Sequence, residues 1–239
     1  LSLAWAANEG LYVPLAHLKP ASQDMAGALP GLLPESGLPD ALLDLQGDPL
    51  RYWDELAPFL DPRNVAFAEV QRILGPLLAD PAVLKVGQNL KYDLIVLGRH
   101  GFEVQGLGDD SMVQSFLVEP GLRHNLDDLS SRHLDIRPIA FESIVGKGKA
   151  QKRFDEAVFE EAVQYAAEDA DLALQLCQKL DAQLTDPPMR RLYREVDLPL
   201  VEVLADMERT GVRLDLVELS RLSVQMQNDR KRAETRVLE

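Results

Sequence analysis

The chain has 239 residues, of which 46% are hydrophobic, enough for one large domain or for one domain and part of another. No run approaches the roughly 18 apolar residues that a membrane span requires, so we expect no membrane partner. The formal net charge of −14 argues against a general nucleic-acid binder, because affinity for phosphates normally comes from Lys and Arg. It does not exclude a nuclease whose clustered carboxylates hold divalent cations.

Strand and helix signals alternate along the first half of the chain. Two short apolar runs around Asn8-Glu9-Gly10 predict a β-hairpin with a tight turn. A Pro- and Gly-rich stretch at residues 19–49 predicts a long surface insertion, whose role the sequence does not reveal. Helical spacing follows at residues 64–78, then a strand at 83–87 and a helix at 91–100. This alternation predicts an α/β fold with a central sheet flanked by helices.

The second half of the chain reads as mostly helical. A long helix is expected from about Asp155, a plausible N-cap, to about Leu184. Pro187-Pro188 ends this helix and predicts a domain boundary, which divides the chain into residues 1–186 and 187–239. Further helices are expected at residues 109–118, 125–134, 189–209 and 216–239. The single cysteine, Cys177, excludes an intramolecular disulfide and fits a reducing cytoplasm.

Two short clusters carry chemistry. Val86-Gly-Gln-Asn-Leu-Lys-Tyr-Asp93 runs from a strand through a Gly-containing turn into a helix, which places Asp93 where α/β folds usually bind ligands. An acid there also simply favours the helix dipole. Tyr165 and Asp169 lie one turn apart on the long helix and share a face, with small alanines between them. The competing interpretation is an amphipathic helix whose acids face water.

Together the clusters resemble known exonuclease motifs. Asn89-x-x-Tyr-Asp93 and Tyr165-x-x-x-Asp169 resemble the second and third motifs of the DEDD superfamily, in its tyrosine branch. The segments around them are similar to the bacterial DNA polymerase I family (family A) almost letter for letter: Leu84-Lys-Val-Gly-Gln-Asn-Leu-Lys-Tyr-Asp93, Gly146-Lys-Gly-Lys149 and Tyr165-Ala-Ala-Glu-Asp-Ala-Asp171. The segment from Glu195 to Asp215 resembles the start of the polymerase thumb in that family.

The resemblance implies an RNase H-like 3'→5' proofreading exonuclease domain, with a mixed central sheet, followed by thumb helices. It implies two Mg²⁺ or Mn²⁺ ions that activate a water and stabilise the leaving oxygen. Asp93 and Asp169 are then metal ligands, and Tyr165 orients the attacking water. Contacts with DNA are implied as well, at Gln88, Asn89, Arg123 and Phe141. Phe141 would stack on a base of the single-stranded 3' end, although core packing explains it nearly as well.

One departure from the family pattern limits what this stretch of chain can do. The family's first motif, Asp-x-Glu, lies on the strand just before the position that matches Leu1. Asp93 and Asp169 alone do not build a two-metal site, so we expect this stretch by itself to be inactive in hydrolysis.

Alternatives therefore stay open. One is a catalytically silent module that supports a polymerase or holds DNA, and a more distant one is an RNase D-like exonuclease. We expect a monomeric cytoplasmic protein at the bacterial nucleoid, whose partners are DNA and the remainder of a polymerase chain.

Overall fold

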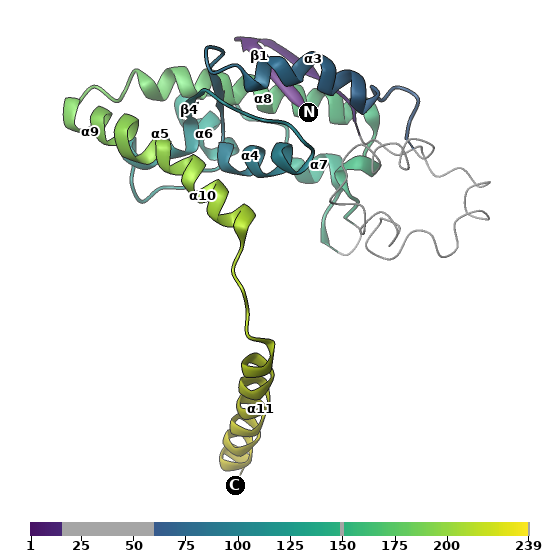
Figure 1. Ribbon diagram of the computed structural model, residues 1–239, viewed down its shortest axis with the longest axis vertical. Coiled ribbons are helices and arrows are strands. Elements are labelled where there is room, and N and C mark those ends of the chain that lie inside the picture. Colours follow the sequence, from purple (N-terminus) through teal and green to yellow (C-terminus); the bar gives the residue numbers. More distant parts are fainter. Residues whose placement is uncertain (16–59, 149–150, 239) are drawn as a thin grey trace. The chain divides into compact units, whose positions relative to one another are not determined.

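The computed structural model describes residues 1–15, 60–148 and 151–238 of the chain (Figure 1). The insertion predicted at residues 19–49 lies outside the described residues. The chain folds as a mixture of helices and short strands, which confirms the predicted α/β class.

The chain opens with the predicted β-hairpin. Strands β1 (Ser2–Ala6) and β2 (Glu9–Tyr12) are antiparallel. Asn8 in the turn has φ 63°, a left-handed conformation that Asn tolerates better than most residues. Its backbone N–H donates to Asp171 Oδ1 at 2.7 Å, which ties the turn to the long helix.

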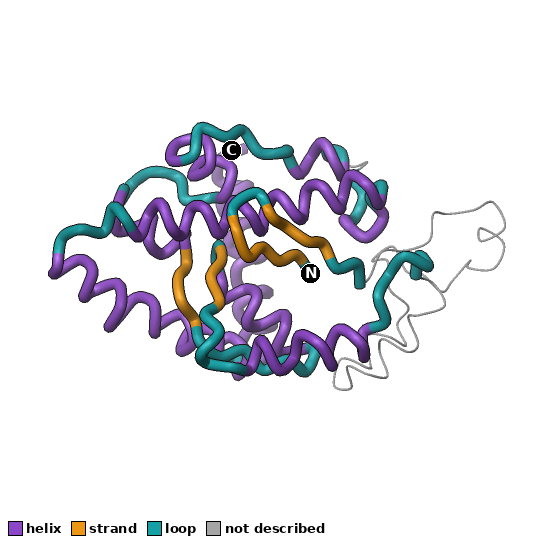
Figure 2. Tube along the Cα trace, turned by 90° about the horizontal axis from the view of Figure 1, so that it is seen from above, coloured by secondary structure: helices purple, strands orange, loops and turns teal. Residues whose placement is uncertain are grey.

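A second pair of strands is parallel. Strand β3 (Lys85–Gly87) pairs with β4 (Leu107–Asp110), and helix α4 (Leu90–Arg99) makes the crossover between them. Figure 2 shows this pair apart from the hairpin, with strands in orange. Within the described residues the two pairs are therefore joined by packing: the long helix α8 (Phe159–Asp181) contacts both strands of the hairpin and also β3.

Other helices pack against these elements. Buried leucines at Leu129, Leu176 and Leu180 pack α6 against α8, and Leu90 and Leu94 of α4 pack against the first part of α10. The other elements are α3 (Phe67–Ala79), α5 (Ser111–Val118), α6 (Leu126–His133), α7 (Phe141–Val145), α9 (Pro187–Leu192), α10 (Leu198–Thr210), α11 (Leu216–Leu238), a 3-10 turn η3 (Phe154–Glu156) and a π-helical turn η4 (Tyr193–Asp197).

Several boundaries differ from the sequence-based expectation: the long helix ends at Asp181, and Pro187-Pro188 opens α9 instead of ending that helix. The helix expected from residue 109 begins at Ser111, because Asp110 still belongs to β4 and caps the helix instead. The long helix begins at Phe159 and not near Asp155, and its N-cap is Val158. Asp155 is held in the turn η3, where it accepts a 3.0 Å hydrogen bond from Arg153 Nε.

The described chain divides into two compact units, Leu1–Ala205 and Asp206–Glu239. The first unit thus extends past Pro187-Pro188, because Tyr193 and Leu198 are buried against Leu184. The predicted domain boundary between residues 186 and 187 does not coincide with the boundary between these two compact units, and it stays a prediction. In the part of the chain that the structure describes, no helix combines the length and apolarity needed to cross a bilayer.

Candidate functional site

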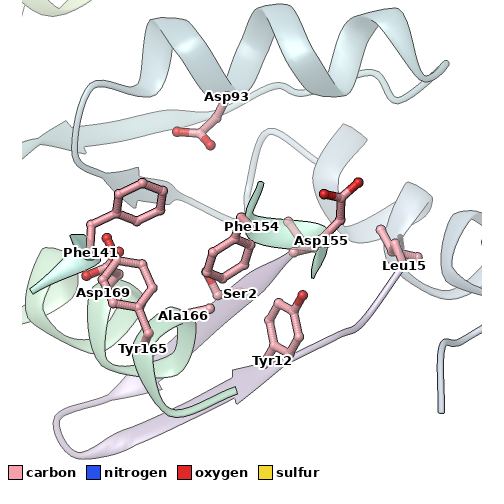
Figure 3. A pocket seen from close by; sticks show the side chains of 11 residues that line it. Ser2, Tyr12, Leu15, Asp93, Phe141, Phe154, Asp155, Tyr165, Ala166 and Asp169 are labelled. Carbon is pink, nitrogen blue, oxygen red and sulfur yellow. The ribbon is translucent and has the colours of Figure 1, made fainter. Parts of the chain in front are cut away.

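A pocket of about 430 Å³ gathers most of the predicted site residues (Figure 3). Its walls come from the hairpin, α4, α7, η3 and α8, segments that lie far apart in the sequence. The residues that line it are Leu1, Ser2, Tyr12, Leu15, Asp93, Phe141, Phe154, Asp155, Tyr165, Ala166 and Asp169. The structure therefore brings Asp93, Tyr165, Asp169 and Phe141 around one space.

Asp93 is positioned by the start of α4. Asn89, the residue before the helix, is left-handed with φ 60° and ψ 49°. The backbone N–H groups of Asn89 and Leu90 donate to the Asp110 carboxylate at 3.1 and 2.8 Å. This contact fixes the first turn of α4, and Asp93 projects from that turn towards the pocket (Figure 3).

The same Asp110 carboxylate caps a second helix. It accepts the backbone N–H groups of Met112 and Val113, at 2.9 and 3.3 Å, at the start of α5. Asp110 is 1% exposed, so these bonds lie away from solvent. One buried carboxylate thus holds the N-termini of both α4 and α5, whose N–H groups favour its charged form while burial opposes it.

A tyrosine from the helical segment supports β4 beside this carboxylate. The Tyr193 hydroxyl accepts the Asp110 N–H and donates to Asp109 Oδ1, both at 3.0 Å. Arg194 adds an ion pair to Asp109 at 3.0 Å and a hydrogen bond to the Gly108 carbonyl at 2.7 Å. The segment after Pro187-Pro188 therefore stabilises the strand that carries the cap of α4.

Tyr165 and Asp169 lie on one face of α8, separated by a turn. The Tyr165 hydroxyl and the Asp169 carboxylate lie close enough for each to shift the pKa of the other. Ala166 lies between them in the sequence and also lines the pocket. Its side chain is small, which leaves room for a ligand at this face of the helix. Glu168 on the same helix accepts the Ile139 N–H at 2.7 Å and so anchors the segment that leads into α7.

Two of the three carboxylates that line the pocket, those of Asp93 and Asp169, are electrostatically perturbed. Burial raises the pKa of Asp169 to about 6; the hydrogen bond from Tyr165 opposes this shift, and the charges of Asp127 and Glu168 add to it. Desolvation also raises the pKa of Asp93 to about 6, and the charge of Asp110 adds to that shift. Asp93 is nevertheless an exposed residue, so solvent screens part of the effect. Sites that concentrate such shifts suit cation binding, because a cation restores the charged form.

Three predicted contact residues lie outside the pocket lining. Gln88 donates to the His124 carbonyl at 2.8 Å and accepts a hydrogen bond from Ser111. Asn89 shapes the start of α4, and Arg123 is exposed on the loop before α6. Their roles with DNA stay predictions.

Sequence reasoning missed other residues of the pocket. Phe154 and Asp155 enter from η3, and Tyr12 enters from the hairpin. A signal for Phe154 was available, since it directly follows the basic residues Lys152 and Arg153. Among the described residues, no group of three or more His, Cys, Asp or Glu side chains is arranged to hold a metal ion.

Comparison with known proteins agrees with this geometry. The 3'-5' exonuclease family matches residues 59–185, more than half of the chain. The chain is 39% identical over 165 residues to DNA polymerase I of Rhizobium leguminosarum, covering 69% of this chain and 16% of the relative. It is 41% identical over 158 residues to DNA polymerase I of Pseudomonas aeruginosa, covering 64% and 17%. The chain thus spans about a sixth of the length of these relatives.

A solved structure supports the same assignment. It is described as the POL domain of Pol1 from M. smegmatis in complex with DNA primer-template and dNTP. The similarity has a TM-score of 0.54 at 27% identity and covers 72% of this chain and 26% of the other. The chain belongs to the 3'-5' exonuclease domain family and is similar to part of bacterial DNA polymerase I.

Proposed function

We propose that the protein hydrolyses mispaired DNA from its single-stranded 3' end, as the proofreading domain of a bacterial DNA polymerase I. The observation that supports this most is the pocket that Asp93 and Asp169 share with the rings of Phe141, Phe154 and Tyr165. Carboxylates suit metal-assisted phosphodiester hydrolysis, and aromatic rings suit unpaired bases. The family to which the chain belongs supports the same activity.

Asp93 and Asp169 fit a hard divalent cation such as Mg²⁺ or Mn²⁺. Carboxylate oxygens are the ligands that these ions prefer, and the raised pKa of each group indicates an uncompensated site for negative charge. Two such ions, when bound, would supply a nucleophilic water and neutralise the leaving 3'-oxygen. The two carboxylates are too few to hold two ions without further ligands.

Tyr165 acts on the attacking water. Burial raises the pKa of its hydroxyl, and Asp169 raises it further, so the hydroxyl stays protonated at neutral pH and cannot act as a general base. It can donate to Asp169, which lies close to it, and accept from a water beside it. Tyr165 therefore orients the nucleophile rather than removing its proton.

We propose that the further metal ligands come from the segment that leads into β1. Leu1 and Ser2 line the pocket, and the amino group of Leu1 lies near enough to Asp93 to interact electrostatically with it. Residues that precede Leu1 in a longer polypeptide would enter the site from this direction. An Asp-x-Glu sequence there would complete the set of carboxylates.

The cellular setting follows from the same proposal. The substrate is DNA with an unpaired 3' end, and residues 187–239 form the first thumb helices of the polymerase. We propose a monomer that works in the cytoplasm at the nucleoid.

A silent DNA-holding module is the second candidate. It is favoured by one observation: among the described residues no metal-binding group of three acids is present. An RNase D-like exonuclease is less favoured, because the chain is similar to DNA polymerase I relatives over more than 60% of its length.

An end-labelling experiment separates these candidates. The full-length protein, meaning the complete polymerase of which we propose this chain is a part, is incubated with single-stranded DNA that carries a 5' label. The incubations contain Mg²⁺, Mn²⁺ or a chelator, and a matched RNA serves as a control substrate. The proposal predicts stepwise shortening from the 3' end of DNA that stops with the chelator. Binding without shortening under every metal condition would support the silent module, and a preference for RNA would support the RNase D-like reading.

A further inference from the structure

Three aromatic rings form one wall of the pocket. The rings of Phe141 and Phe154 are 6.2 Å apart between centroids and nearly parallel, at 19°. The Tyr165 ring lies 5.8 Å from each of them and is tilted by 58° to both. The rings come from α7, η3 and α8, so the wall exists only in the folded chain (Figure 3).

We propose that Phe154 is a second base-contacting residue of this site, which stacks on a base of the 3' end next to the one held by Phe141. The inference rests on the proposed exonuclease function and deepens it. It assigns to Phe154 a substrate contact rather than a packing role.

The orientation of the rings supports this assignment. Successive bases of a nucleic-acid strand lie nearly parallel when they stack, and Phe141 and Phe154 present faces with the same relation. Phe154 is only partly buried and lines an open pocket, so its ring is accessible to a ligand. A base placed on each ring would remove apolar surface from water without any hydrogen bond to a base edge, which makes binding tolerant of sequence.

The charges of the pocket point to bases, not phosphates, as the groups held at this wall. Asp93 and Asp169 line the same space and would repel phosphates that no cation neutralises. Asp155 is largely neutralised by its ion pair with Arg153, which also holds the turn η3. The hydroxyl of Tyr165 interacts with Asp169, so π faces are the main feature that the wall offers to a strand.

The position of Phe154 is fixed by its own turn. Arg153 N–H donates to Glu156 Oε2 at 3.0 Å, and Ala157 N–H donates to the Phe154 carbonyl at 3.2 Å. These bonds bracket Phe154 on both sides and hold the backbone before a strand arrives. A ring that is positioned in advance loses little entropy on binding.

Photo-crosslinking tests the contact directly. Oligothymidylates carrying 5-iododeoxyuridine at the terminal or the penultimate 3' position are irradiated with the full-length protein in a chelator and with its Asp93→Ala variant in Mg²⁺, so that hydrolysis is suppressed with and without the cation. Peptide mapping by mass spectrometry should find adducts on Phe154 from one position and on Phe141 from the other.

Kinetics provides the second readout. Phe154→Leu keeps an apolar side chain of similar reach but removes the ring, so the KM for single-stranded DNA should rise about tenfold while kcat changes less than about twofold. Phe154→Trp should restore the KM. Phe159→Leu is the matched control, because Phe159 is a partly buried ring close in sequence that packs under Arg63 outside the pocket lining.

The inference requires both results. It is overturned if Phe154 yields no adduct, or if the KM of Phe154→Leu equals that of Phe159→Leu while the wild-type protein degrades DNA. Adducts on Phe154 from a wild-type protein that degrades nothing would support the base contact and defeat the proposed exonuclease function instead.

Discussion

Asp110 offers the sharpest test of how the fold supports the site. Its buried carboxylate accepts four backbone N–H groups, two at the start of α4 and two at the start of α5. Asp110→Ala would leave these donors without their acceptor and would release the turn that precedes Asp93. We therefore expect a loss of stability that is concentrated at the two helix starts.

The size of the loss follows from opposing effects. An unsatisfied buried donor costs about 1–3 kcal/mol, and loss of an N-cap costs about 0.5–2 kcal/mol. Against this, the pKa of Asp110 is raised because its burial outweighs its four hydrogen bonds, so removing the charge also relieves a desolvation cost. The net decrease in the free energy of unfolding should be about 3 kcal/mol, with Asp110→Asn at about 2 kcal/mol since one oxygen acceptor remains.

Urea unfolding and hydrogen exchange measure the two parts of this prediction. The matched control is Asp186→Ala, an exposed N-cap that accepts one bond of 3.3 Å from Met189 N–H and should cost about 1 kcal/mol. In Asp110→Ala the amides of Leu90 and Met112 should lose protection, while amides in the core of α8 exchange as in the wild type. A loss no larger than that of Asp186→Ala, or unchanged exchange at both helix starts, would refute the role assigned to Asp110.

Three further predictions concern single side chains. Burial raises the pKa of Cys177 to about 12, so iodoacetamide should label it at pH 8 only after unfolding, and rapid labelling of the native protein would contradict the packing. Burial, and to a smaller extent the charge of Arg99, lowers the pKa of His100 below 6.5. Near and below pH 6.5 the unfolded state therefore binds more protons than the folded state, and the free energy of unfolding should fall as the pH drops. His100→Gln should flatten that dependence in urea titrations, and an unchanged slope would exclude His100 as its source. Glu168→Ala removes the acceptor of the Ile139 N–H and should cost about 1–2 kcal/mol in urea unfolding, whereas Glu168→Gln should retain most of the stability; equal losses would contradict the bond.

Helix positions were largely predictable because they depend on local spacing. Apolar residues at helical spacing predicted α3 within a few residues, and the strand-turn-helix pattern around Gly87 predicted β3 and α4. Strand β4 was not predicted, since Leu107-Gly-Asp-Asp110 is too short for an alternating pattern. Its conformation depends on tertiary partners, namely β3 beside it and the Tyr193 hydroxyl that binds the Asp110 N–H.

The residues of the site were likewise predictable where they depend on local sequence and not where they depend on tertiary contacts. Asp93, Tyr165 and Asp169 could be predicted because each lies in a short motif on a regular element. Phe154 was missed, because its place in the pocket depends on the turn η3, and the sequence analysis expected the long helix to begin at about Asp155, inside that turn. Asp110 was also missed as a support, since a carboxylate that caps two helices is recognisable only when both helix starts meet in space.

The central claim is that the two pocket carboxylates, Asp93 and Asp169, serve metal-dependent hydrolysis of DNA 3' ends. The most direct measurement is kcat/KM for nucleotide release from single-stranded DNA by the full-length protein with Mg²⁺, compared with Asp93→Ala and Asp169→Ala. Glu161→Ala is the control, because it removes an exposed acid from the same helix as Asp169. We predict that each pocket variant loses roughly a thousandfold or more, while Glu161→Ala stays within about twofold of the wild type. Activity of either pocket variant within about tenfold of Glu161→Ala would contradict the account.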